Sequence, residues 1–300
     1  MLKLNTLIYA YQEFYFVMSI RQVFELIYYS HITLVALAMV LTGSISAVLY
    51  AQIKWQVVLL VGLSTFFTYS LDNLFDWKRD LPRYRNIKKL VQIYHKITYI
   101  LIPAAVVGVL FLTFVSSNEL RIGILLLGAA VAMGTTRFSN YRENSSSPYQ
   151  SINRFILNRL FITTIWTTVS VFLPIWYDNS EIIGRTWNAF FYIFFLIFPY
   201  AAIWKIESSA DSLKKKLFGS TLMKFLSVFP IISMIFVISD VITGIAPAYG
   251  LFNVLPPIII FAALFVIIKK PNALKKKISL LTIILIILCG SSTLIHLYAG

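Results

Sequence analysis

Three aspartates at four-residue spacing follow an apolar stretch in the first third of the chain. The segment TYSLDNLFDWKRDLPRYRNIKK, residues 68–89, contains Asp72, Asp76 and Asp80. In a helix, residues four apart lie one above another, so these carboxylates would form a ladder along one face with Asn73 beside it. Stacked like charges repel unless a cation lies between them, and Mg²⁺ is held by a few carboxylates and by substrate phosphates. The spacing predicts either a Mg²⁺ site or a solvated face whose acids pair with nearby basic side chains, namely Lys78, Arg79, Arg83 and Arg85.

A second acidic segment aligns with the first without a gap. Residues 67–80, FTYSLDNLFDWKRD, fall on residues 198–211, FPYAAIWKIESSAD, and four pairs match: Phe67 with Phe198, Tyr69 with Tyr200, Asp76 with Glu207 and Asp80 with Asp211. Only 12 residues of the chain are acidic, so two acid-on-acid matches behind two aromatic matches indicate an internal duplication. The copy is imperfect, because Ile203 and Trp204 stand opposite Asp72 and Asn73.

Composition places both segments in a membrane protein. Of 300 residues, 59% are hydrophobic and 13% are charged, whereas the charged fraction of a soluble domain is about a quarter. Windows of about 19 residues predict nine spans. They are residues 32–50, 57–71, 97–115, 121–135, 155–175, 187–204, 225–246, 250–268 and 279–299.

The basic residues predict the orientation of these spans. All but four of the 26 Lys and Arg residues lie on the same side as the N-terminus; the exceptions are Lys54, Arg121 and Arg185 opposite, and Arg159 within a span. By the positive-inside rule, the N-terminus and both acidic segments are cytoplasmic and the C-terminus is outside. The net charge of +14 therefore reflects topology and does not point to nucleic acid. The same lysines would attract anionic lipid or a phosphorylated substrate.

The expected fold is an all-α integral membrane protein with about nine transmembrane helices. Two four-helix pseudo-repeats, about 31–135 and 155–268, and a last helix at 279–299 would surround a central cavity and form one transmembrane domain, residues 31–300. Residues 1–30 carry no cleavable signal peptide and are expected to lie in the cytoplasmic interface, with a tenth span as the alternative. The single cysteine, Cys289, is expected to be a small buried apolar residue.

The two acidic motifs resemble those of a known family. The run Asp72-Asn73-x-x-Asp76-x-x-x-Asp80 after the second span, with Glu207-x-x-x-Asp211 after the sixth, is similar to the UbiA superfamily of intramembrane prenyltransferases. That family typically has Asn-Asp-x-x-Asp-x-x-x-Asp in its first motif and a second aspartate-rich motif between helices six and seven. Three departures stand out: the first pair is reversed, Glu207 replaces an aspartate, and the glycine and threonine that often follow are absent from SLKKKLFGS, residues 212–220.

The resemblance implies a chemistry and a set of residues for it. In such enzymes Mg²⁺ bridges carboxylates to the diphosphate of a polyprenyl donor, the C–O bond ionises, and a lipophilic or aromatic acceptor attacks the allylic cation. The implied catalytic metal ligands are Asp72, Asp76, Asp80, Glu207 and Asp211. The implied donor-binding residues are Asn73, Lys78, Arg79, Arg83 and Arg159, with Tyr69 and Tyr200 as aromatic partners of the cation.

Other interpretations remain open at this point. Arg159 lies five residues into a span, where it either serves the site or extends its long side chain to the interface. A transporter built on a parallel repeat would use the carboxylates to coordinate a cation. A homologue without catalytic activity would bind an isoprenoid, and the departures in the second motif favour it. Asp240 has either a role or only contact with interfacial water, and His31, His95 and His296 show no metal-ligand spacing.

Overall fold

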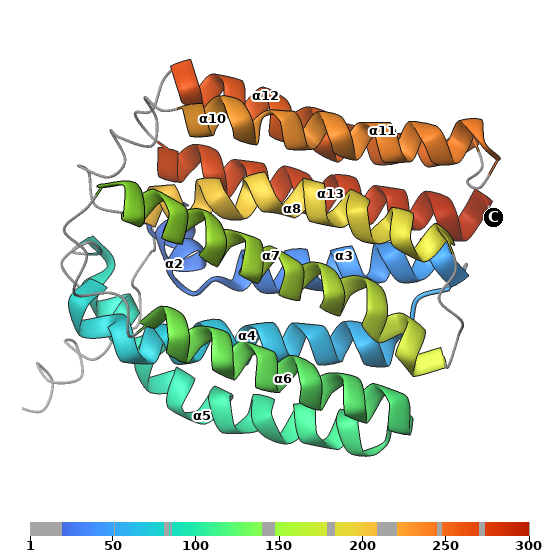
Figure 1. The fold of residues 1–300 in the computed structure, drawn as a ribbon. Helices are drawn as coiled ribbons and strands as arrows, with labels where there is room; N and C mark the ends of the chain where they lie inside the picture. The colour runs from blue at the N-terminus through green and yellow to red at the C-terminus, as the bar shows by residue number, and fades with distance from the viewer. Residues whose placement is uncertain are drawn as a thin grey trace, which may run out of the picture.

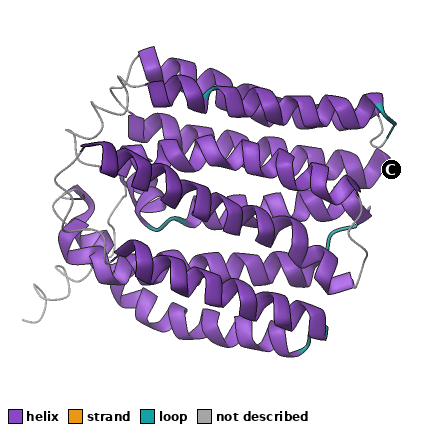
Figure 2. Cartoon of the chain, in the orientation of Figure 1, coloured by secondary structure: helices purple, strands orange, loops and turns teal. Residues whose placement is uncertain are grey.

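The computed structural model describes residues 20–50, 52–80, 84, 86–139, 148–178, 184–208, 221–244, 248–269 and 274–299. Within these ranges the chain is almost entirely helical and contains no strand (Figure 2). The helices are α2 (Ile20–Tyr29), α3 (Ile32–Tyr50), α4 (Trp55–Asp80), α5 (Lys88–Phe114), α6 (Asn118–Ser139), α7 (Pro148–Asp178), α8 (Gly184–Ser208), α10 (Thr221–Leu226), α11 (Val228–Ile242), the 3₁₀ helix η2 (Ala248–Val254), α12 (Leu255–Lys269) and α13 (Leu274–Ala299).

The helices form a closed ring that is flattened into two layers. Consecutive long helices contact one another from α3 to α13, and α13 packs back against α3. In Figure 1, α11, α8, α7 and α6 form one layer, and α12, α13, α3 and α4 form the other. The layers meet through contacts of α7 with α3 and α4, and of α8 with α13. Each predicted repeat therefore corresponds to four long helices that contact one another in chain order.

Burial follows the position of each helix in this arrangement. α3 contacts α4, α7, α8 and α13, and 61% of its apolar window is buried inside the protein. α5 lies at the margin and only 11% of its window is buried. A helix that is apolar on all sides is either surrounded by protein or exposed to lipid. α3 is thus the central helix of the bundle, and α5 offers most of its surface to the bilayer.

The predicted membrane spans agree largely with the helices. Eight segments of the described chain are long and apolar enough to cross a membrane. They are Ile32–Leu49, Trp55–Phe75, Lys88–Phe114, Phe155–Tyr177, Gly184–Trp204, Met223–Ile242, Gly250–Ile267 and Leu280–Tyr298. The span predicted at 121–135 lies in α6, which is not among these eight. A multi-pass membrane protein is therefore supported, while the count of nine spans and the orientation remain predictions.

Two features at one end of the bundle differ from the simplest expectation. α4 continues nine residues beyond the span predicted at 57–71, so its last turns carry the aspartates. Before the first span, α2 is ten residues long, too short to cross a bilayer, and it packs against α3 and α5. His31 connects α2 to α3 with φ of 56°, a left-handed conformation that sharply turns the chain. Residues 1–19 lie outside the described chain.

Candidate functional site

The two motif helices end at the same end of the bundle. In Figure 1, α4 and α8 both run from the end where the C-terminus lies to the opposite end. The helical conformation predicted for the ladder is confirmed, because α4 includes Asp72, Asp76 and Asp80. Glu207 lies in the last turn of α8. The aligned acidic positions 76 and 207 therefore both lie near helix ends on one side of the molecule.

The structure describes these acidic side chains only in part. Asp72 is exposed. The side chains of Asp76, Lys78, Arg79, Asp80 and Glu207 are not described, and Arg83 and Asp211 lie outside the described residues. Among the side chains that are described, no group of three or more His, Cys, Asp or Glu could hold a metal ion. The Mg²⁺ site and the facing central cavity therefore remain predictions.

Just inside these helix ends, residues of α4 and α8 meet around His31. The His31 ring stacks on Tyr69 of α4, with centroids 5.1 Å apart and planes 8° apart. The ring of Trp204 in α8 also lies near His31, with centroids 6.1 Å apart and planes tilted by 45°. In the alignment of the two acidic segments, Trp204 matches Asn73, and Asn73 also contacts His31. His31 thus contacts both members of a residue pair that the alignment matches.

Asn73 ties the motif helix to the turn that holds His31. Its side-chain Nδ2 donates a 2.9 Å hydrogen bond to the Tyr29 carbonyl and lies 3.3 Å from His31 Nδ1. Burial lowers the pKa of His31 from 6.5 to about 4, with the hydrogen bond to the Tyr29 backbone opposing this shift. At neutral pH the imidazole is therefore uncharged, and in its Nε2–H tautomer it can accept the hydrogen bond from Asn73. The Asn73 side chain acts in positioning, through the turn between α2 and α3.

Arg159 brings a buried positive charge to the same cluster. It lies on α7 with 8% of its surface exposed, and its Nε atom has no hydrogen-bond partner among the described residues. It interacts electrostatically with Tyr69, whose side chain also accepts a hydrogen bond from Trp166. The side chain of Arg159 is buried inside the protein, and both interpretations of this residue remain predictions. A buried guanidinium without a full set of acceptors is costly, so the arrangement suits an anionic ligand.

Tyr200 occupies a more structural position than the alignment suggested. Its hydroxyl lies 2.7 Å from Thr282 Oγ1 on α13, and only 3% of the residue is exposed. Its ring lies 6.1 Å from that of Trp204, which in turn stacks on Tyr28 at 4.9 Å. These contacts anchor α8 against α2 and α13. Ile203 is 1% exposed, so the second motif has packing residues where the first has Asp72 and Asn73.

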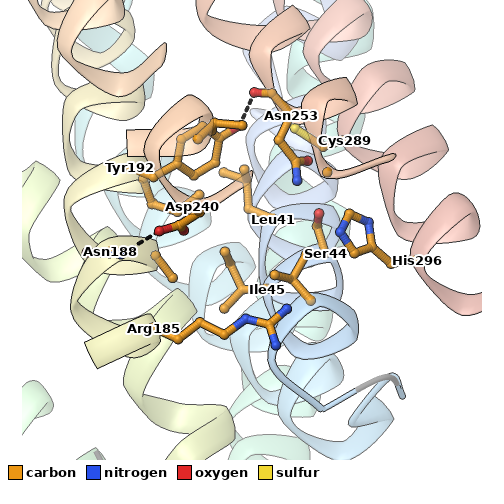
Figure 3. A pocket seen from close by; sticks show the side chains of 15 residues that line it. Leu41, Ser44, Ile45, Arg185, Asn188, Tyr192, Asp240, Asn253, Cys289 and His296 are labelled. Atoms are coloured by element: carbon orange, nitrogen blue, oxygen red, sulfur yellow. Dashed lines mark hydrogen bonds between the residues drawn. The ribbon is translucent and has the colours of Figure 1, made fainter. Parts of the chain in front are cut away.

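Sequence reasoning missed several members of this cluster. His31, Trp166 and Trp204 were not predicted to belong to it. The alignment of Trp204 with Asn73 could have indicated that Trp204 belongs to the cluster. No sequence pattern indicated His31, because its position depends on the left-handed turn. A second polar cluster, which includes Asp240, Arg185 and Asn188, was also missed. It lies at the other end of the bundle and lines a cavity of about 50 Å³ (Figure 3).

Comparison with known proteins does not assign this site. No model of a protein family, no curated protein and no solved structure matches the chain. The resemblance to the prenyltransferases therefore rests on the motif residues and their placement.

Proposed function

We propose that this protein is an intramembrane prenyltransferase, which transfers a polyprenyl group from a polyprenyl diphosphate to a lipophilic or aromatic acceptor. One observation carries the proposal: the helices with the two acidic motifs end on one side of the bundle, and their repeat-equivalent residues Asn73 and Trp204 flank His31. Beside them lies the buried Arg159. A polyprenyl diphosphate has an anionic head and an apolar chain. Arg159 suits the head, and the apolar helices of the bundle suit the chain.

The donor set at the end of α4 fits Mg²⁺. Carboxylate oxygens on one helical face are hard ligands, and three of them leave coordination positions for phosphate oxygens and water. When bound, the ion would neutralise charge on the departing diphosphate. Asp72, Asp76 and Asp80 span about 12 Å along the helix axis, so they would hold more than one Mg²⁺ ion, with Glu207 and Asp211 contributing from the second motif.

The protein's own residues would provide the rest of the chemistry. In the reaction the allylic C–O bond breaks, diphosphate keeps the electron pair, and the acceptor forms the new bond and loses a proton. Arg159, Lys78, Arg79 and Arg83 would stabilise the leaving group by charge. Tyr69 lies beside Arg159 and Trp166, where its ring could face the cationic carbon without attacking it. Stacked aromatic rings would also exclude water, which would otherwise capture the cation.

A second candidate function is supported by a specific observation. Ile203 is buried and Trp204 stacks on Tyr28, so these two positions of the second motif serve packing. A protein with one intact motif would bind a polyprenyl diphosphate through Mg²⁺ and not cleave it. This isoprenoid-binding homologue without catalysis differs from the enzyme in one measurable respect, the release of diphosphate.

Prenyl transfer by the purified full-length protein tests the proposal. The protein would be incubated with labelled polyprenyl diphosphates of several chain lengths, Mg²⁺ and a membrane lipid extract. We expect label to move from the donor to an uncharged, organic-soluble product, and to stay in the donor when EDTA replaces Mg²⁺. Glu119→Gln, which removes a carboxylate at the opposite end of the bundle, should transfer as the wild type does. Mg²⁺-dependent donor binding without any product would favour the second candidate.

A further inference from the structure

The end of the bundle away from the acidic motifs contains a polar cavity that the proposed function does not use. The cavity has a volume of about 50 Å³ and is lined by α3, α8, α11, η2 and α13. Its polar lining residues are Ser44, Arg185, Asn188, Tyr192, Asp240, Asn253 and His296 (Figure 3). Five helices thus contribute polar groups to one small space at the edge of the membrane-spanning region.

Opposite charges line this cavity without forming an ion pair. The Asp240 carboxylate accepts a hydrogen bond from the Asn188 amide. Arg185 interacts with Asp240 only through longer-range electrostatics, and its guanidinium has no hydrogen bond or ion pair with any described residue. Figure 3 shows it extending away from the Asn188–Asp240 pair. Within the described part of the chain, a cation and an anion therefore line one cavity without pairing, and each has hydrogen-bonding capacity left.

The two charges define the kind of ligand. An anion drawn to Arg185 would be repelled by Asp240, and a cation drawn to Asp240 would be repelled by Arg185. A metal ion is a poor candidate as well, since no described group of three His, Cys, Asp or Glu side chains could hold one. A dipolar ion, with its positive group at Asp240 and its negative group at Arg185, satisfies both side chains.

The position and volume of the cavity limit which dipolar ion it can bind. Arg185 is the second residue of its span, and Asp240 and His296 each lie two residues before the end of theirs. These positions correspond to the level of lipid headgroups. A volume of about 50 Å³ accommodates roughly four waters, which is enough for a primary ammonium with its two neighbouring carbons but not for the bulkier trimethylammonium. Arg185 is only partly buried, so a phosphate at its guanidinium would lie outside this enclosed volume.

We propose that this cavity binds the phosphoethanolamine group of a lipid or of a free phosphodiester, with the ammonium at Asp240 and the phosphate at Arg185. Asn188 positions the Asp240 carboxylate through their hydrogen bond. The site is independent of the proposed transferase activity, because it uses none of the same residues and lies at the other end of the bundle.

Lipid binding to the detergent-purified full-length protein tests this site. Native mass spectrometry would compare phosphatidylethanolamine, phosphatidylcholine and phosphatidylglycerol. We expect phosphatidylethanolamine to bind about tenfold or more tightly than the other two, as one well-formed charge-assisted contact implies. Arg185→Gln should lose about tenfold in phosphatidylethanolamine affinity. Asp240→Asn should weaken phosphatidylethanolamine and strengthen anionic phosphatidylglycerol, since the cavity then carries a net positive charge. Lys54→Gln, the same charge change on this side but outside the cavity, should bind as the wild type does.

Two further comparisons make the result decisive. If soluble glycerophosphoethanolamine displaces the lipid, the natural ligand is a free phosphodiester. If the lipid stays bound, the natural ligand is a membrane lipid. Either result supports the site. Equal binding of all three lipids would overturn the proposal, as would variants at Arg185 and Asp240 that match Lys54→Gln. If Arg185→Gln does not fold, Asp240→Asn still tests the proposal, because it should bind phosphatidylethanolamine less tightly and phosphatidylglycerol more tightly than the wild type does.

Discussion

The Arg159 side chain is buried near Tyr69, and its Nε atom has no hydrogen-bond acceptor among the described residues. Replacing a poorly compensated buried charge with an apolar side chain of similar length is neutral or stabilising. We therefore predict that Arg159→Met raises the free energy of unfolding by up to about 2 kcal/mol in the absence of ligand. The same change should weaken binding of a polyprenyl diphosphate by about tenfold or more, because one charge-assisted contact is lost.

Thermal unfolding in detergent and donor-binding isotherms measure the two effects separately. Arg159→Lys is the matched control, because it keeps the charge but loses the planar guanidinium. It should retain more donor affinity than Arg159→Met. A less stable Arg159→Met protein with unchanged donor affinity would show that the arginine serves packing alone.

His31 gives a prediction about pH. Its pKa is about 4 in the folded protein and about 6.5 in the unfolded chain. Between these values the unfolded state binds a proton that the folded state does not, so this residue's contribution to stability is lost as the pH falls from about 6.5 to about 4. His31→Asn removes the titration, and asparagine tolerates the positive φ at this position. The unfolding temperature, followed by tryptophan fluorescence between pH 7.5 and 4.5, should fall less steeply for His31→Asn than for the wild type; equal slopes would contradict the assignment.

Residue identities predicted the acidic helix face but only part of the cluster behind it. The four-residue spacing of Asp72, Asp76 and Asp80 was enough to predict a shared helix face, because helix geometry is local. The neighbours of Asn73 were not predictable in this way. Its partners, the Tyr29 carbonyl and the His31 ring, lie more than 40 residues away in sequence and are placed by a tertiary contact.

At the scale of helices, the contact between α6 and α7 depends on one glycine. A Cβ atom added at Gly123 would overlap the Trp176 ring, whereas one added at Gly128, on the same helix, would meet nothing within 4 Å. We predict that Gly123→Ala lowers the free energy of unfolding by about 1–3 kcal/mol through overpacking. Gly128→Ala should leave it unchanged or raise it by up to about 1 kcal/mol, because alanine favours the helix.

The single cysteine provides the measurement for this pair. Cys289 is buried in α13, so a thiol-reactive dye labels it only as the bundle opens. The midpoint of labelling on heating should shift down for Gly123→Ala and not for Gly128→Ala. Equal midpoints would mean that Trp176 moves aside without loss of packing.

The positions of the helices were predicted more accurately than their ends. Most of the predicted apolar windows fall on helices that are long and apolar enough to cross a membrane. The windows ended α4 too early, because a hydropathy average falls at Asp72 while the helical hydrogen bonds continue to Asp80. α6 shows the converse limit: its apolar stretch is short, and its membrane crossing was not confirmed.

For the whole molecule, the charge distribution predicts topology. Residues 72–96 and 205–224 are expected to face the cytoplasm together, since they belong to the side rich in Lys and Arg. Cys289→Ala supplies a cysteine-free background, into which single cysteines are placed at Arg85 and Lys215. A membrane-impermeant maleimide should label neither position in intact cells and both in inside-out vesicles. Labelling of either position from outside intact cells would contradict the predicted topology.

The closed ring of helices was only partly accessible to sequence reasoning. The duplication between 67–80 and 198–211 predicted two equivalent halves, and residues 73 and 204 do meet at His31. The flattening of the ring into two layers was not predicted, because it depends on how α7 packs across α3 and α4. The polar cavity between α8, α11 and α13 has the same origin, since its charged residues are 55 positions apart in the chain, at 185 and 240.

The measurement that tests the central claim most directly is Mg²⁺-dependent release of diphosphate from a polyprenyl diphosphate. The wild-type protein should release it, and Asp76→Ala should reduce the rate on the order of 10²-fold or more, as does loss of a major electrostatic stabiliser. Asp211→Ala, in the less complete second motif, should reduce it less, and Glu119→Gln should not change it. A wild-type protein that binds the donor with Mg²⁺ and releases no diphosphate at any chain length would contradict the enzymatic account.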